Sequence, residues 1–164
     1  MKLYLVRHGK ATGEAGDRGD AARPLSQSGR DEVSRMASFL ARSIRVPRVV
    51  HSGYLRAVQT ALILAEALGP GKIVEDSTVP MGPSDDVVKF AKALDGVDET
   101  VMAVGHMPFM ADLVSYLTVG DPDADICYFE TAAVACLERV GKRWVLRWLA
   151  GPALLGLKGI DKGD

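Results

Sequence analysis

Short apolar segments alternate with longer segments of helical periodicity along most of this 164-residue chain. The short segments are typical of buried strands and occupy residues 3–6, 48–51, 72–75 and 100–105. Strands that alternate with helices pair in parallel, because each helix carries the chain back to the edge where the next strand begins. The pattern therefore predicts an α/β fold of three layers, with helices on both faces of a mostly parallel central sheet.

Four segments between and after these strands are predicted to be helices, at residues 25–44, 53–69, 83–96 and 106–120. In the first helix, Ser26 or Ser28 is available as the N-cap. One face of that helix collects apolar side chains, those of Val33, Met36, Ala37, Leu40 and Ile44.

The helix at 53–69 is expected to end at Gly69 and to turn a second apolar row toward the core. That row consists of Leu55, Val58, Leu62 and Ala65. In the helix at 106–120, Pro108 fits the first turn, where proline is tolerated.

A β-hairpin is predicted near the C-terminus, where "AAVACLERV" and "RWVLRWL" flank a Gly-Lys pair. This hairpin should add antiparallel strands at one end of the sheet. The length suits one domain, which is predicted to cover residues 1–157, and residues 158–164 are expected to be a C-terminal tail.

The composition disfavours several classes of protein. A formal net charge of −1 gives no basis for binding nucleic acid or a membrane surface. The apolar runs are too short to span a bilayer, and "LYLV" is too short for the core of a signal peptide, so we expect a cytoplasmic protein. Cys127 and Cys136 lie among apolar neighbours and are predicted to be reduced core thiols.

Three strand ends carry charged or ionisable groups. The first strand runs into Arg7 and His8, the second leads to a helix with Arg56 in its first turn, and "VMAVG" leads into His106. Parallel strands end at one edge of a sheet, where α/β proteins bind their ligands. The sequence therefore predicts that two histidines and two arginines converge on one site.

Each residue of the set also has a structural interpretation, because a lone arginine is usually solvated and a lone histidine is usually a hydrogen-bonded structural residue. His51 is expected to be such a residue, since Ser52 beside it is better placed to cap the next helix. A metal site is the next alternative. Adjacent arginines oppose a divalent cation and no carboxylate or cysteine cluster accompanies the histidines, so no metal or other cofactor is expected.

Forked arginine donors are suited to oxyanions, and phosphate is foremost among these. A neutral imidazole is a good nucleophile toward phosphorus, and the flanking guanidinium charges favour the neutral form of His8. Gly9 would let the chain turn sharply and the phosphate approach closely. The residues thus indicate phosphoryl transfer through a histidine.

Four motifs occur in order, "LVRHG", "RPLSQSGR", "HSGYLRAVQTA" and "VGHMP", over residues 5–108. In this the chain resembles the histidine phosphatase (phosphoglycerate mutase-like) superfamily, and within it the SixA-type phosphohistidine phosphatases. The resemblance implies a phosphoglycerate mutase-like fold, with His8 as the phosphorylated nucleophile. It also implies that Arg7 and Arg56 clamp the phosphate and that His106 donates a hydrogen bond to it.

The sequence departs from the mutase branch, which usually has an asparagine after its "RHG" and an acidic proton donor between the second and third motifs. This chain contains no asparagine. The carboxylates in the interval fit no donor pattern and are better explained as solvated or helix-capping groups; they are Glu75, Asp76, Asp85 and Asp86. Gly53 replaces a common proline, and Asp20 and Arg23 receive no role.

The leading hypothesis is a metal-independent phosphatase that hydrolyses phosphohistidine on a protein through a phospho-His8 intermediate. A small-molecule phosphomonoesterase of the same superfamily and a non-catalytic phosphate-binding module are the alternatives. The expected partner is a phosphohistidine-carrying signalling or phosphotransfer protein or a small phosphate ester, and neither nucleic acid nor a membrane. The oligomeric state stays open.

Overall fold

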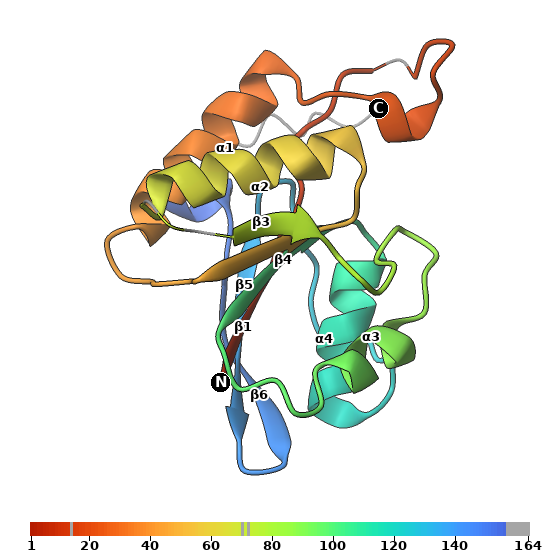
Figure 1. The fold of residues 1–164 in the computed structure, drawn as a ribbon, viewed down its shortest axis with the longest axis vertical. Helices are drawn as coiled ribbons and strands as arrows, with labels where there is room; N and C mark the ends of the chain where they lie inside the picture. The colour runs from red at the N-terminus through yellow and green to blue at the C-terminus, as the bar shows by residue number, and fades with distance from the viewer. Residues whose placement is uncertain (14, 70, 72, 157–164) are drawn as a thin grey trace.

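The computed structural model describes residues 1–13, 15–69, 71 and 73–156, and its elements follow the predicted alternation (Figure 1). The strands are β1 (Lys2–Arg7), β2 (Arg48–His51), β3 (Ile73–Asp76), β4 (Val101–Gly105), β5 (Val134–Val140) and β6 (Arg143–Ala150). The α-helices are α1 (Gln27–Leu40), α2 (Leu55–Ala67), α3 (Val87–Ala93) and α4 (Phe109–Val119). Two short 3-10 helices are η1 (Asp20–Ala22) and η2 (Pro152–Leu155).

The strands form one sheet in the order β3-β2-β4-β1-β5-β6. The first four of these pair in parallel, β5 pairs antiparallel with β1, and β6 pairs antiparallel with β5. The mostly parallel sheet and the C-terminal hairpin are therefore confirmed. Gly141, in the two-residue turn of that hairpin, has a φ of 60°, a conformation that glycine adopts without strain.

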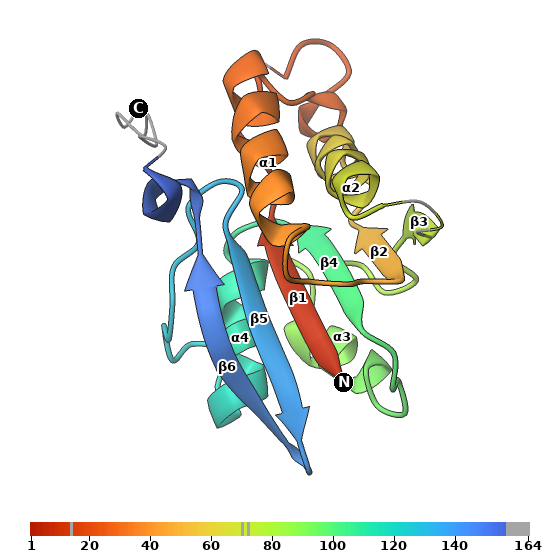
Figure 2. The ribbon, with the colours of Figure 1, turned by 90° about the vertical axis from the view of Figure 1, so that its left-hand side faces the viewer.

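Helices cover both faces of the sheet, as predicted for three layers (Figure 2). One hydrophobic core lies between the sheet and the pair α1 and α2, and a second lies between the sheet and the pair α3 and α4. The central strand β4 is buried throughout. This arrangement leaves the carboxyl ends of β1, β2 and β4 side by side at one edge.

Helix α1 matches its prediction closely. Ser26 is the N-cap, and its Oγ accepts a hydrogen bond from the backbone amide of Gly29 at 3.0 Å. The predicted inward side chains are all buried; they are Val33, Met36, Ala37, Leu40 and, beyond the helix end, Ile44.

The predicted inward face of α2 is wrong. Leu62 is 52% exposed and Leu55 and Val58 are only half-buried, so Ala65 alone of the predicted row is buried. The buried residues are Arg56, Ala57, Thr60, Ala61, Leu64 and Ala65. Because the inward face consists mainly of small and polar residues, hydrophobicity alone selected the wrong side of the helix.

Several element boundaries also differ from the predictions. Helix α2 has Tyr54, not Ser52, at its N-cap, and no side chain caps it. Helix α3 is shorter than predicted and begins after Asp86, whose carboxylate accepts from the amides of Val88 and Lys89. Helix α4 begins after Pro108, which is its N-cap residue and not part of its first turn.

Cys136 is buried and Cys127 is half-buried, so only Cys136 is a core thiol; neither forms a disulfide. No helix in the described part of the chain is long and apolar enough to cross a membrane. The predicted domain boundary at residue 157 and the tail at 158–164 lie outside the described residues.

Candidate active site

The sheet order brings the predicted site residues together. Strand β4 pairs with β1 on one side and β2 on the other, with Arg7 opposite Gly105 and His51 opposite Val104. The segments that follow these strands therefore leave the sheet at one place. The rings of His8 and His106 lie 4.9 Å apart between their centroids, and Arg56 contacts both rings.

Both ring nitrogens of His8 have hydrogen-bond partners. Nδ1 lies 2.7 Å from the carbonyl oxygen of Gly9, and the Nε of Arg56 donates to Nε2 at 3.2 Å. A carbonyl oxygen can only accept and an arginine can only donate, so Nδ1 carries the proton and Nε2 carries the lone pair. Burial, with smaller contributions from the charges of Arg56 and Arg7, lowers the pKa of His8 to about 4. The ring is therefore neutral, with Nε2 as its nucleophilic atom.

Arg56 is buried and held in place by Asp20. Its Nη1 donates to the backbone oxygen of Asp20 at 2.7 Å and its Nη2 to the carboxylate at 2.8 Å. Its Cζ lies 4.9 Å from the centre of the Tyr54 ring. The guanidinium is thus fixed on two sides before any ligand binds.

Asp20 connects two arginines. Arg23 donates to the other carboxylate oxygen at 2.9 Å and to the carbonyl oxygen of Thr12, which ties the loop after β1 to the site. Hydrogen bonds from Arg56 and then Arg23 lower the pKa of Asp20. The sequence assigned neither Asp20 nor Arg23 a role; the motif "RPLSQSGR" marked the loop but not its contact with Arg56.

Arg7 is the last residue of β1 and is held by a backbone contact. Its Nη1 donates to the carbonyl oxygen of Phe129 at 2.7 Å. Its Nε is buried and has no hydrogen-bond partner in the part of the chain that the structure describes. A buried guanidinium N–H without a partner is costly, so an anion that accepted from it would be stabilised here.

His106 is 1% exposed and enclosed by polar and aromatic groups. Its Nε2 lies 2.6 Å from the Oγ of Ser52, its Nδ1 lies 3.4 Å from the Nη2 of Arg56, and the Tyr54 ring centre is 4.5 Å away. Burial, followed by the charges of His8 and Arg56, lowers the pKa of His106 to about 3. Ser52 therefore orients a catalytic candidate and does not cap α2, a contact that sequence reasoning missed.

Gly9 serves packing as well as the site. Its φ is not positive, so the sharp turn predicted for it is not what requires glycine here. A Cβ at this position would lie 2.5 Å from Cγ2 of Val33 and 3.0 Å from the backbone oxygen of Gly29. The amide of Gly9 donates to Oγ1 of Thr60 at 3.1 Å, which joins the segment after β1 to α2.

Each of the four carboxylates considered as a proton donor has a structural contact. Glu75 pairs with Arg48 at 3.5 Å, and Asp76 pairs with Nδ1 of the buried His51 at 3.0 Å. Asp85 accepts from the amide of Gly82 at 2.6 Å, and Asp86 caps α3. His51 thus occupies the structural position that the sequence analysis expected.

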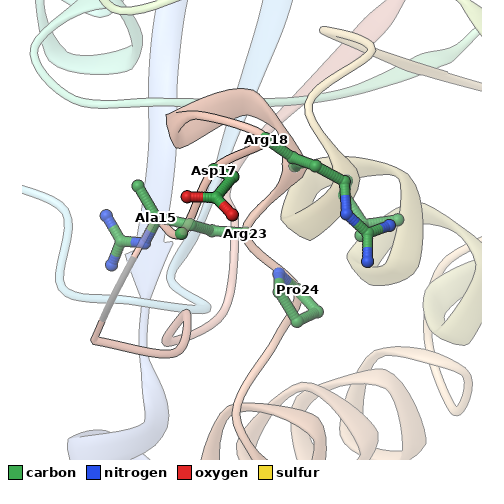
Figure 3. Close-up of a pocket in the computed structure, with 8 residues that line it drawn as sticks. Ala15, Asp17, Arg18, Arg23 and Pro24 are labelled. Atoms are coloured by element: carbon green, nitrogen blue, oxygen red, sulfur yellow. The ribbon is translucent and has the colours of Figure 1, made fainter.

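A cavity of about 530 Å³ adjoins the site (Figure 3). Its lining includes Asp17, Arg18 and Arg23 from the loop after β1, and Leu55 from the start of α2. Leu55 directly precedes Arg56, and Arg23 bonds to Asp20. Two residues that line the cavity, Arg23 and Leu55, therefore adjoin the pair of Asp20 and Arg56.

Comparison with known proteins agrees with this geometry. The sequence profile of the histidine phosphatase superfamily (branch 1) matches residues 3–79, a range that contains Arg7, His8 and Arg56. Over this range the chain is similar to the histidine phosphatase superfamily. A search of curated proteins found no match.

Solved structures of several phosphatases superpose on most of the chain. The protein histidine phosphatase SixA, solved with tungstate, is 29% identical, with 94% of this chain and 99% of that chain covered and a TM-score of 0.82. The protein from Agrobacterium tumefaciens assigned as phosphohistidine phosphatase SixA is 25% identical, with 92% and 97% covered and a TM-score of 0.77. The α-ribazole phosphatase of Shigella flexneri, 16% identical with 91% and 96% covered and a TM-score of 0.72, shares the fold.

Proposed function

We propose that this protein is a histidine phosphatase that hydrolyses phosphohistidine on a protein through a covalent phospho-His8 intermediate. The superfamily and the similar structures support a phosphatase, and the two SixA proteins favour phosphohistidine as its substrate. The observation that carries the proposal is the fixed tautomer of His8, which presents an unprotonated Nε2 to the guanidinium of Arg56.

The reaction has two displacements at phosphorus. His8 Nε2 attacks the phosphorus, and the bond from phosphorus to the substrate nitrogen breaks with its electron pair on the leaving imidazole. Water then attacks phospho-His8, inorganic phosphate leaves, and His8 returns to its neutral state. Covalent catalysis divides one difficult step into two easier ones.

The arginines stabilise the transferring group. An entering phosphoryl group replaces the contact of Arg56 Nε with His8 and can accept from that Nε and from the unpartnered Nε of Arg7. Asp20 keeps Arg56 in position during both steps through its two hydrogen bonds. Preorganised donors of this kind stabilise the charge that spreads over the equatorial oxygens.

His106 can serve as a further donor because Ser52 can reverse its hydrogen bond. In the free site, Nδ1 of His106 accepts the long contact from Arg56, so Nε2–H donates to Ser52. A serine hydroxyl can also donate. If Ser52 donates to Nε2, Nδ1 carries the proton and can donate to a phosphate oxygen, without the ring becoming charged.

The contacts of the carboxylates indicate which leaving group the site favours. Expulsion of an alkoxide needs a proton from a positioned acid, which typically contributes about 10²–10⁴-fold. Glu75, Asp76, Asp85 and Asp86 are each engaged in a structural contact. Imidazole is a much weaker base than alkoxide, so a site without a dedicated acid favours phosphohistidine and activated aryl phosphates.

A small phosphate ester is the second candidate substrate. The cavity of about 530 Å³ lined by Arg18 and Arg23 favours it, because that space could hold a second polar group of a small molecule. An assay that compares a phosphohistidine protein, a sugar phosphate and an aryl phosphate separates the two. We expect kcat/KM to be at least about 100-fold higher for the phosphohistidine protein than for the sugar phosphate. A preference for the sugar phosphate, lost on mutation of Asp85 and Asp86 together, would overturn the proposal.

A further inference from the structure

We propose that Tyr128 is a specificity-determining residue whose ring stacks on the planar leaving group, and this inference rests on the proposed function. The contacts described above hold the phosphoryl group, and none of them involves the imidazole that departs. Tyr128 is an exposed aromatic side chain that contacts Arg7. Its Oη lies 3.5 Å from Nη1 of Arg7.

The backbone fixes the place of Tyr128. The next residue, Phe129, is 0% exposed, and its carbonyl oxygen accepts from the same Nη1 of Arg7 at 2.7 Å. Further along, the amide of Ala132 donates to the backbone oxygen of His8, and the oxygen of Ala133 accepts from the amide of Arg7. The segment from Tyr128 to Ala133 is thus bound along Arg7 and His8, so Tyr128 stays at the edge of the site.

The ring itself is free to receive a ligand. Tyr128 is 68% exposed, and within the described part of the chain its ring stacks on no other aromatic ring. Tyr54, in contrast, is half-buried and already packed against His106 and Arg56. An exposed Tyr128 ring next to Arg7 can therefore contact a substrate without displacing any packing.

The leaving group and the Tyr128 ring are connected through Arg7. In phosphoryl transfer the attacking and leaving atoms lie roughly in line, and the arginines hold the equatorial oxygens. The leaving imidazole therefore lies across the phosphoryl group from His8 Nε2. Arg7 holds that group in the proposed mechanism, and Tyr128 Oη lies 3.5 Å from Arg7 Nη1, so the inference places the imidazole beside the exposed ring. Two aromatic rings in offset or edge contact are stabilised by more than the burial of their surface. An alkyl group gains less from contact with a ring.

Tyr128→Ala and Tyr128→Phe test this inference, with kcat and KM measured on three substrates. For a phosphohistidine protein and for p-nitrophenyl phosphate, we expect Tyr128→Ala to lower kcat/KM by about three- to tenfold, mainly through KM. For glycerol phosphate the same change should have less than a twofold effect. Tyr128→Phe should keep kcat/KM within about twofold, since the ring and not the hydroxyl makes the contact. Phe39→Ala, which removes an exposed aromatic ring of α1, is the matched control.

The outcomes separate this inference from the proposed function. A uniform loss on all three substrates, with weaker inhibition by inorganic phosphate, would show that Tyr128 only positions Arg7 and would overturn the inference. Equal losses for Tyr128→Phe and Tyr128→Ala would overturn it as well. If the wild-type protein does not hydrolyse phosphohistidine, the proposed function fails. The comparison of p-nitrophenyl phosphate with glycerol phosphate still tests whether the Tyr128 ring contacts a planar leaving group.

Discussion

His8 has a protonation state that is dictated by its two neighbours. The carbonyl oxygen of Gly9 adjoins it in the chain, whereas Arg56 lies 48 residues away and reaches it because β1 and β2 flank β4 and end at the same edge of the sheet. The motif "RHG" could therefore predict the nucleophile but not its tautomer. Ser52 and Asp20 are similar cases, because they act through His106 and Arg56 and carry no unusual local signature.

Arg56→Lys should lower kcat/KM by about 30- to 1000-fold, which corresponds to a loss of about 2–4 kcal/mol of transition-state stabilisation. Lysine keeps the charge but lacks the fork that contacts His8 and Asp20 together and that is proposed to hold the phosphate. Steady-state kinetics with a phosphohistidine protein measure the effect, and Arg143→Lys in the hairpin is the control. Activity of Arg56→Lys within threefold of wild type would show that charge alone suffices.

Helix α1 packs unusually close to the segment after β1, and two glycines make this possible. A Cβ on Gly29 would collide with the backbone of Lys10, and a Cβ on Gly9 would collide with Val33. The same helix provides Ser26, whose amide and hydroxyl both bond to the carbonyl oxygen of Lys10. Helix α1 therefore determines where the chain runs just beyond His8.

Gly29→Ala should destabilise the protein, by about 1–3 kcal/mol of unfolding free energy, and should also lower activity. In a helix this change ordinarily stabilises, by roughly 0.5–1 kcal/mol, because alanine loses less backbone entropy on folding. Here the added methyl group meets backbone and not a flexible side chain. Urea unfolding measures the difference, and Gly13→Ala, where a Cβ would meet open space, is the control. A stabilised Gly29→Ala protein would show that α1 can shift freely.

Helix α2 shows which features of an element the sequence did not reveal. Its location and its last residues were predictable from periodicity and from Gly69. Its inward face was not, because Arg56 and Thr60 are buried there by contacts with distant residues. Thr60 accepts from the amide of Gly9 and donates to the backbone oxygen of Arg56. A helix that supports a polar site buries polar side chains, which a hydrophobic pattern assigns to the surface.

For the molecule as a whole, the sequence predicted the layers, the mostly parallel sheet and the final hairpin. Those features follow from local periodicity and from the handedness of connections. The strand order did not follow from the alternation, and the order places β4 between β1 and β2. That placement is what brings His106 between His8 and Ser52, so the details of the site depended on topology.

The pH dependence of stability is a second property of the whole molecule. His8 and His106 have folded-state pKa values of about 4 and about 3, below the ordinary value of 6.5, so between pH 7 and pH 5 the unfolded chain binds more protons. The unfolding free energy should therefore fall as pH decreases through this window, by up to about 1.4 kcal/mol per pH unit for each histidine. Urea unfolding at several pH values checks this. The slope should be shallower in a His8→Asn, His106→Asn double variant, and equal slopes would contradict the assignment.

Phosphorylation of His8 is the central claim, and trapping the intermediate tests it most directly. Protein mixed rapidly with a substrate labelled in its phosphoryl group, then quenched, should carry a label that is labile in acid and stable in alkali, as a phosphoramidate is. Labelling should persist in EDTA and in His51→Gln, whose histidine pairs with Asp76. It should be absent from His8→Ala. A label on the His8→Ala protein, or a label stable in acid, would contradict the account.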